Sequence, residues 1–377
     1  LNHATRILDR DGHDFLFRQQ IWRKQIITKR ETTMKKLLTS TTAAAALVLA
    51  AGSAHAEGKL SIYHWFEYIP QTLLDKFAAE HDVEVVMDTY DSNESMLATL
   101  KAGALGTYDV VVPTDYMVSI LISEGMAAEI ADGERKNLGN VKAEFADPAY
   151  DSGLKHSIPY QGGTTSFMVD TSAYSGDINT TDIIFNPPAE LQGKINMIDS
   201  QGEVLALAAV HMGIPQCSTD RAQLKALDAM LQAAKPHWAS FNSDTAKEVL
   251  AAGDVAAGMI FNGYGAKARE ARDSLQYAFA KQGWVNWMDS VVLLKDAPNR
   301  DNAILFMDFL LEPENIAAVT NFARYRDAVK GADAFHDPAL ATEPEGNPPA
   351  GIEGVFVQTC TEEVQAVYDR IWTNLKK

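Results

Sequence analysis

Residues 109–113 read DVVVP, from Asp109 to Pro113, and this stretch decides the fold class. Three successive valines before a proline are typical of a strand that helices cover on both faces of a parallel sheet. On its N-terminal side, strand-like and helix-like patterns alternate: strands at 60–65 and 83–87, helices at 71–80 and from the N-cap Ser92 to Gly103. The alternation predicts a doubly wound α/β lobe.

A second α/β set follows Pro159. Its expected strands lie at 165–169, 194–198, 238–241, 256–261 and 275–279, with helices at 203–211, 221–234 and 244–252. Further helices are expected at 302–311, 314–322 and 362–375. The junctions at 157–163 and 282–289 look extended, which suits two lobes joined by crossing strands with a cleft between them. A chain of 377 residues also exceeds the size that one hydrophobic core usually serves.

The segment from Met34 to Ala56, MKKLLTSTTAAAALVLAAGSAHA, has the layout of a cleavable secretory signal peptide. Its apolar run is interrupted by hydroxyl residues and falls short of the roughly 20 residues that a membrane span needs. The segment therefore predicts an exported protein. Residues 1–33 precede this signal and lack a periodic apolar face, so we expect them to be a non-native or over-extended start.

The charge balance favours cationic ligands over anionic ones. The chain has a net charge of −17 at pH 7, and residues 57–377 alone carry −22, from 24 Lys and Arg against 46 Asp and Glu. Such a surface repels nucleic acid and concentrates small cations nearby. Solubility alone is the alternative explanation that composition leaves open.

Motifs of common enzyme classes are missing. The sequence has no GxSxG elbow, Walker loop, HExxH or CxxC, and no two histidines in 57–377 have metal-ligand spacing. We therefore expect no catalytic residue, metal or cofactor. The two cysteines, Cys217 and Cys360, favour a disulfide in an exported protein, with two buried free thiols as the alternative.

Aromatic and acidic residues gather where predicted strands end. The first strand is followed by Phe66, Glu67 and Tyr68, a later one ends at Phe261 before Tyr264, and the second junction contains Trp284, Trp287 and Asp289. Ligands of open α/β sheets bind outside the carboxyl ends of strands. Aromatic rings attract ammonium groups by about 0.5–2 kcal/mol each, and carboxylates neutralise them. The pattern suits a chain-like amine, although rings that only pack the core would look the same.

Five segments in order resemble the periplasmic spermidine/putrescine-binding proteins of ABC transporters. They are IYHWFEYIP (62–70), DTYDSNESMLATLKAG (88–103), YDVVVPTDYMV (108–118), AAGDVAAGMIFNGYG (251–265) and WMDSVVLLKDAPN (287–299). The resemblance runs from about Lys59 to the C-terminus. It implies a two-lobed type II periplasmic binding fold that closes by a hinge, a polyamine as ligand, an inner-membrane ABC permease as partner and a monomeric state.

The resemblance also implies site residues. The family's aromatic box is similar to Trp65, Tyr68, Phe261, Trp287 and Tyr325. Its small hydroxyl residue near the ligand corresponds to Thr114, and its amine-binding acids correspond to Glu203 and Asp289.

Two positions depart from the family pattern. Glu67 stands where the family has Asp, and Phe261 with Tyr264 replaces a Trp-x-x-Asp motif. A lost carboxylate predicts weaker binding of one end of a multiply charged polyamine, unless Glu67 substitutes. A monoamine, a guanidine or a zwitterionic amino compound would also fit fewer acids and a phenol.

Two rivals and the lobe bounds complete the expectations. A binding protein for anions or carboxylates usually needs a bidentate arginine; the matched motifs contain none, but Arg324 and Arg326 flank Tyr325. An enzyme on the same fold, resembling porphobilinogen deaminase, lacks support because both cysteines are expected to be bridged.

The first lobe is expected to comprise 57–160 and 284–328, and the second 161–283 and 329–377.

Overall fold

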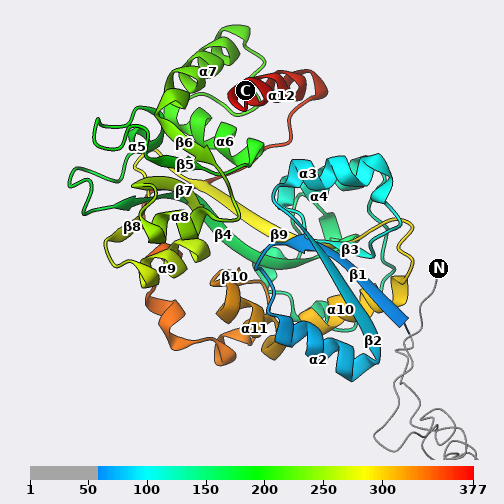
Figure 1. Ribbon diagram of the computed structural model, residues 1–377. Helices are drawn as coiled ribbons and strands as arrows, with labels where there is room; N and C mark the ends of the chain where they lie inside the picture. Colours follow the sequence, from blue (N-terminus) through cyan, green and yellow to red (C-terminus); the bar gives the residue numbers. More distant parts are fainter. Residues whose placement is uncertain (1–57) are drawn as a thin grey trace, which may run out of the picture. The chain divides into compact units, whose positions relative to one another are not determined.

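The computed structural model describes residues 58–377 (Figure 1). The expected signal peptide and the segment before it lie outside the described residues. The strands are β1 (Gly58–Trp65), β2 (Val83–Tyr90), β3 (Val110–Val111), β4 (Ser157–Asp170), β5 (Ile195–Met197), β6 (Trp238–Phe241), β7 (Ala257–Phe261), β8 (Leu275–Ala278), β9 (Val285–Leu293), β10 (Arg326–Asp327) and β11 (Val355–Phe356). The helices are α2 (Gln71–His81), α3 (Asn93–Thr99), α4 (Asp115–Ser123), α5 (Asp182–Phe185), α6 (Gln201–Met212), α7 (Arg221–Ala234), α8 (Ala246–Ala252), α9 (Asn262–Ala271), α10 (Arg300–Leu310), α11 (Pro313–Ala323) and α12 (Glu362–Leu375).

One sheet runs through the described chain in the order β2-β1-β3-β9-β4-β7-β5-β6. The pairs β1–β2, β1–β3, β5–β6 and β5–β7 are parallel, whereas β4 and β9 run antiparallel to each other and to their neighbours β7 and β3. Two parallel sets are thus joined by two long crossing strands, which contain the junctions that the sequence marked as extended.

The DVVVP stretch has the burial that its composition predicts. Val110, Val111 and Val112 are all fully buried. The carboxylate of buried Asp109 accepts hydrogen bonds from the backbone N–H groups of Ser61 (2.7 Å) and Asn299 (2.6 Å). Because a buried carboxylate without donors would be costly, these bonds explain how an acid can begin this strand.

Two separate hydrophobic cores define two lobes. The first core gathers side chains from β1, α2, α10 and α11, among them Leu60, Phe77 and Phe306. The second gathers side chains from β5, α6, α7 and α12, among them Ile195 and Leu227. We call the parts around these cores the first and the second lobe; α3 and α4 pack in the first, and α8 and α9 in the second.

The crossing strands pass from one core to the other within a few residues. On β4, Tyr160 belongs to the first core and Phe167 to the second; on β9, Trp287 belongs to the first and Val285 to the second. Between them, Gly163 leaves no room for a side chain, because a Cβ there would lie 2.4 Å from the Trp287 ring. Strand β4 and Trp287 are therefore in close contact at the crossing.

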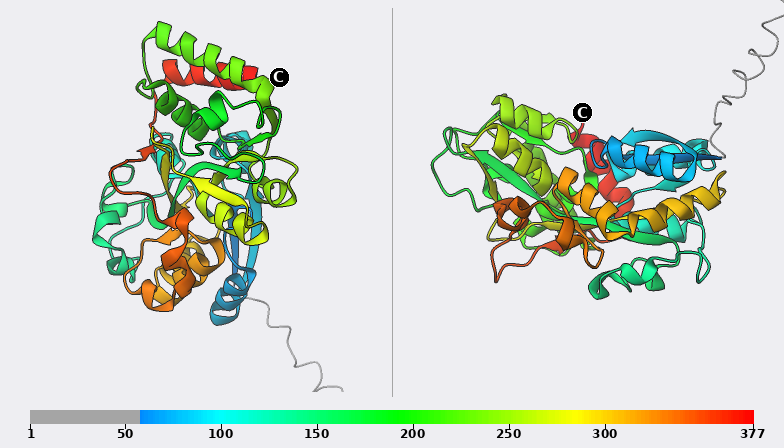
Figure 2. Two further views of the ribbon diagram at one scale, coloured as in Figure 1. Left: turned by 90° about the vertical axis from the view of Figure 1, so that its left-hand side faces the viewer. Right: turned by 90° about the horizontal axis from the view of Figure 1, so that it is seen from below.

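The C-terminal segment leads from the first lobe back to the second. Val329 and Ala332, just after β10, pack in the first core, whereas α12 packs in the second. Helix α12 lies beside α7, as the left view of Figure 2 shows. Its approach is tied down by the expected Cys217–Cys360 disulfide, which the structure contains. None of the helices between residues 58 and 377 is long and apolar enough to cross a membrane.

Candidate functional site

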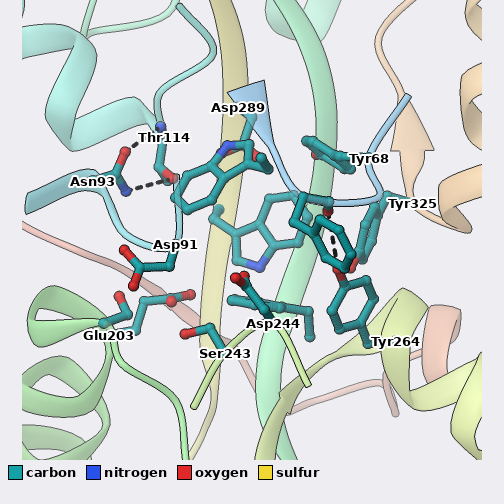
Figure 3. Close-up of a pocket in the computed structure, with 15 residues that line it drawn as sticks. Tyr68, Asp91, Asn93, Thr114, Glu203, Ser243, Asp244, Tyr264, Asp289 and Tyr325 are labelled. Atoms are coloured by element: carbon teal, nitrogen blue, oxygen red, sulfur yellow. Dashed lines mark hydrogen bonds between the residues drawn. The ribbon is translucent and has the colours of Figure 1, made fainter. Parts of the chain in front are cut away.

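A pocket lies between the lobes (Figure 3). Its walls come from both lobes: Trp65 ends β1, Glu203 lies in the first turn of α6, and Asp289 belongs to the crossing strand β9. The fifteen lining residues are Trp65, Phe66, Tyr68, Asp91, Asn93, Thr114, Ser200, Glu203, Ser243, Asp244, Phe261, Tyr264, Trp287, Asp289 and Tyr325.

The structure brings ten of the eleven residues expected from the sequence into this pocket. Glu67 is the exception, because its carboxylate binds the ammonium of Lys247 instead of lining the pocket. Tyr264 lines the pocket, but it lies in the first turn of α9 and not in a loop, since α9 begins directly after β7. Sequence reasoning missed this helix.

Sequence reasoning also missed five polar lining residues. They are Asp91, Asn93, Ser200, Ser243 and Asp244. The signal was present: each lies within three residues of the carboxyl end of β2, β5 or β6. Applying the rule about strand ends to small polar residues as well as to rings and acids would have found them.

Polar groups form one side of the pocket, where Figure 3 shows Asp91 and Glu203. The Asn93 side chain donates to the Thr114 hydroxyl (2.9 Å) and accepts from the Thr114 backbone N–H (3.2 Å). The indole N–H of Trp287 donates to the Thr165 hydroxyl, and this hydroxyl donates to Glu203. The bonds fix the pocket's polar side before any ligand arrives.

Asp289 is the most unusual carboxyl group in the pocket. It is 5% exposed, and its Oδ1 atom finds no hydrogen-bond donor among the described residues. Burial raises the pKa of Asp289 well above its usual value, and the Thr114 hydroxyl offsets only part of the effect. A buried acid in this state is stabilised as a carboxylate only when a cation reaches it.

Other acids around the pocket behave in the same way. Burial raises the pKa of Glu203 to about 7 and that of Asp115, next to the pocket, to about 7. Burial, followed by the charge of Asp91, also raises the pKa of Asp244. The pocket is therefore short of positive charge.

Aromatic rings form the opposite side, where Figure 3 shows Tyr68, Tyr264 and Tyr325. The Tyr325 ring packs edge-on against Tyr68 (5.3 Å between centroids) and Trp287 (4.9 Å). The Tyr264 hydroxyl donates to the backbone carbonyl of Phe66 (3.0 Å), which joins the second lobe to the first. This side of the pocket therefore ends at a contact between the lobes.

Only one group of three or more His, Cys, Asp and Glu side chains among residues 58–377 has metal-site geometry. It consists of Asp327, Asp333 and His336 and lies outside the pocket. The ammonium of Lys142 lies 3.3 Å from Asp327 and 3.7 Å from Asp333. A lysine thus already supplies the positive charge that a metal ion would bring.

A family model described as "Bacterial extracellular solute-binding protein" matches residues 72–348. The chain belongs to the bacterial extracellular solute-binding proteins. This solute-binding protein is 31% identical over 333 residues to the spermidine/putrescine-binding periplasmic protein of Escherichia coli K12, covering 88% of this chain and 95% of that protein. It is 30% identical to a putrescine/cadaverine-binding protein of Pseudomonas aeruginosa, covering 88% and 97%.

Solved structures agree with the sequence relatives. The spermidine/putrescine ABC transporter substrate-binding protein of Streptococcus pneumoniae superimposes with a TM-score of 0.69 at 25% identity, covering 85% of this solute-binding protein and 99% of that chain. The expected periplasmic binding protein fold with its crossing strands is therefore confirmed.

Proposed function

We propose that this protein is the periplasmic component of an ABC transporter that captures a small cationic amine of the polyamine class and delivers it to an inner-membrane permease. It acts by binding between two lobes and neither makes nor breaks a bond. One observation carries the proposal: the fifteen lining residues, all within the described chain, include four acids and no lysine, arginine or histidine. The acids are Asp91, Glu203, Asp244 and Asp289.

The chemistry of an amine matches this wall. Asp289 and Glu203 pair with the amino groups, because buried carboxylates need a cation and buried ammonium groups need an acid. Trp65, Tyr68, Phe261 and Trp287 contact the methylene chain and add cation–π attraction. The names of the relatives support this class, since they bind spermidine, putrescine or cadaverine.

A zwitterionic amino compound is the second candidate, but the arginines next to Tyr325 do not favour it. Arg324 pairs with Glu270 (2.6 Å) and Glu343 (2.8 Å), and neither Arg324 nor Arg326 lines the pocket. A ligand carboxylate would therefore meet acids without a guanidinium partner. Another small amine would fit the same lining acids and rings. The thermal unfolding experiment described below distinguishes these candidates.

Location, assembly and lobe bounds are part of the same proposal. The periplasmic names of the relatives support export by the segment 34–56, and the protein is proposed to act as a monomer. The expected bounds are 57–160 with 284–328 for the first lobe and 161–283 with 329–377 for the second. Because Val329 and Ala332 pack in the first core, we propose that the chain returns to the second lobe only after Ala332.

Thermal unfolding with a ligand panel tests the function. The protein from residue 57 onward is unfolded and refolded to remove carried-over ligand. It is then melted with putrescine, cadaverine, spermidine, spermine, agmatine, amino acids, sugars and anions. A ligand at about 100 times its dissociation constant adds about 2.7 kcal/mol to the free energy of unfolding.

We expect amines alone to raise the melting temperature. A shift produced only by a sugar or an anion would overturn the amine assignment while leaving the family membership intact. A shift with amino acids but not with diamines would favour the zwitterionic candidate.

A further inference from the structure

A lysine from the protein itself lies at the aromatic end of the pocket. Lys247, at the start of α8 in the second lobe, places its ammonium 2.6 Å from the Glu67 carboxylate of the first lobe. The same ammonium lies 4.7 Å from the centroid of the Tyr264 ring, which lines the pocket. A cation of the protein therefore stands just behind the last ring of the pocket.

The charges at this rim cancel among themselves. Lys247 also pairs with Glu248, and Lys267 lies over the Tyr264 ring at 5.9 Å from its centroid. Two lysines thus face two glutamates and these four charges offset one another, while the charge of the lining residue Asp244 also reaches Tyr264. Although burial favours the neutral amine, hydrogen bonds to Glu248 and Glu67 raise the pKa of Lys247, so its ammonium stays charged.

The same end is closed by a contact between the lobes. The hydroxyl of Tyr264 donates to the Phe66 carbonyl, and the Lys247–Glu67 pair bridges the lobes beside it. Of the four lining carboxylates, Asp289 lies on β9 and Asp91 and Glu203 lie on the polar side, whereas Asp244 precedes α8 and lies within reach of the charge of Lys247. A ligand chain that runs past Tyr264 would meet the fixed ammonium of Lys247, whose pairs with Glu67 and Glu248 already occupy both of these carboxylates.

We propose that Lys247 is a specificity-determining residue. By forming an ion pair with Glu67, it makes this carboxylate unavailable to the ligand and restricts the site to short amines with no more than two positive charges. The inference rests on the proposed function and narrows its ligand class. Putrescine and cadaverine find acids for both ends, Asp289 for one and the Asp91–Glu203–Asp244 side for the other. The third ammonium of spermidine meets Lys247, and like charges repel.

Isothermal titration calorimetry on the full mature chain tests the inference. We expect putrescine or cadaverine to bind at least about tenfold more tightly than spermidine, since an ammonium buried without an acid is costly. In Lys247→Met the freed Glu67 carboxylate accepts the third ammonium. The spermidine-to-putrescine affinity ratio should then rise about tenfold or more, with putrescine affinity changing little.

Matched variants distinguish the specific effect of the Lys247–Glu67 pair from the general effect of removing a positive charge. Lys247→Arg keeps the cation and should keep the parent ratio. Adding Glu67→Gln to Lys247→Met should abolish the gain for spermidine. Lys281→Met removes the same charge from an exposed pair with Asp177, outside the pocket lining, and should leave the ratio unchanged. If Lys247→Met fails to fold, Glu67→Gln alone should still leave the diamine preference intact.

The outcomes distinguish the two proposals. If no amine binds the parent, the proposed function fails and this inference fails with it. If amines bind but the parent takes spermidine as tightly as diamines, or Lys247→Met leaves the ratio unchanged, the role of Lys247 is wrong and the amine-binding function stands.

Discussion

Asp289 shows how a single side chain prepares the pocket for a cation. It lies on a strand that crosses between the lobes, so the fold holds it where both lobes meet. Its orphaned Oδ1 atom and raised pKa are costs that the folded protein bears at this position. Such costs are typical of functional sites, where a ligand supplies the missing partner.

Replacing Asp289 separates binding from stability. Asp289→Asn should weaken putrescine binding by roughly 2–5 kcal/mol, the usual effect of removing one member of a buried charge pair. The melting temperature without ligand should not fall, because the amide has no charge to desolvate. Calorimetric titration and thermal unfolding measure the two effects. Asp177→Asn, at an exposed ion pair, is the control and should bind like the parent; parent-like affinity in Asp289→Asn would contradict the proposed site.

The raised pKa values of Glu203 and Asp115 predict opposite pH trends for stability and affinity. Both groups have a pKa of about 7, above the usual values for such carboxyls. The folded protein therefore holds these protons more tightly than the unfolded chain, and their contribution to stability is lost as the pH rises through about 7. An ammonium ligand favours the carboxylates, so amine affinity should increase over the same range.

Titration in two buffers of different ionisation heat measures the protons released when putrescine binds near pH 6.5. We expect net release, and a smaller release in Glu203→Gln. An affinity that stays constant from about pH 5 to pH 8, with no proton release, would rule out this coupling.

At the scale of elements, the helices and strands with a clear hydrophobic periodicity were predicted from the sequence. The predicted strands and helices and the extended junctions at β4 and β9 are found where the patterns indicated, whereas helix α4 was not predicted. Helix α9 was missed because its sequence, NGYGAKAREA, has glycines at its second and fourth positions, and glycine disfavours helix interiors. Its first turn nevertheless needs a small residue, since a Cβ at Gly263 would lie 2.2 Å from the Ala323 carbonyl.

Only those parts of the candidate site that local sequence patterns mark could be predicted. Strand ends indicated Asp289 and the aromatic residues other than Tyr325, and the resemblance to the family added Thr114, Glu203 and Tyr325. The Lys247–Glu67 pair joins residues 180 positions apart and in different lobes. No local pattern encodes such a contact, because it depends on how the two lobes meet.

The crossing of β4 with Trp287 makes Gly163 sensitive to substitution. In Gly163→Ala the new methyl group would collide with the Trp287 ring and with Asn262 Oδ1, 2.5 Å away. Overpacking of this kind costs about 1–3 kcal/mol of unfolding free energy. Because Trp287 lines the pocket, amine affinity should fall as well. Chemical denaturation and titration measure both; Gly139→Ala, whose Cβ would meet no atom within 4 Å, should be neutral.

For the whole molecule, the disulfide adds stability without shaping the pocket. Cys217 and Cys360 are 143 residues apart, and neither lines the pocket. Closing so long a loop can stabilise the folded state by up to about 5 kcal/mol through the unfolded chain. The Cys217→Ser/Cys360→Ser variant should melt at a lower temperature and keep the order of amine affinities. An altered order would show that the bridge positions the lobes.

The contacts across the pocket rim also affect how fast a ligand can enter the pocket. The Lys247–Glu67 and Tyr264–Phe66 contacts involve protein groups alone, so the lobes can hold together between encounters with ligand. An amine enters only during intervals of opening, and the observed association rate is then the encounter rate multiplied by the open fraction. Salt screens an ion pair at a partly exposed rim, which lengthens those intervals. Moderate salt should therefore raise the association rate of the parent more than that of a Lys247→Met variant. Lys247 would then slow the entry of ligands as well as select among them by charge.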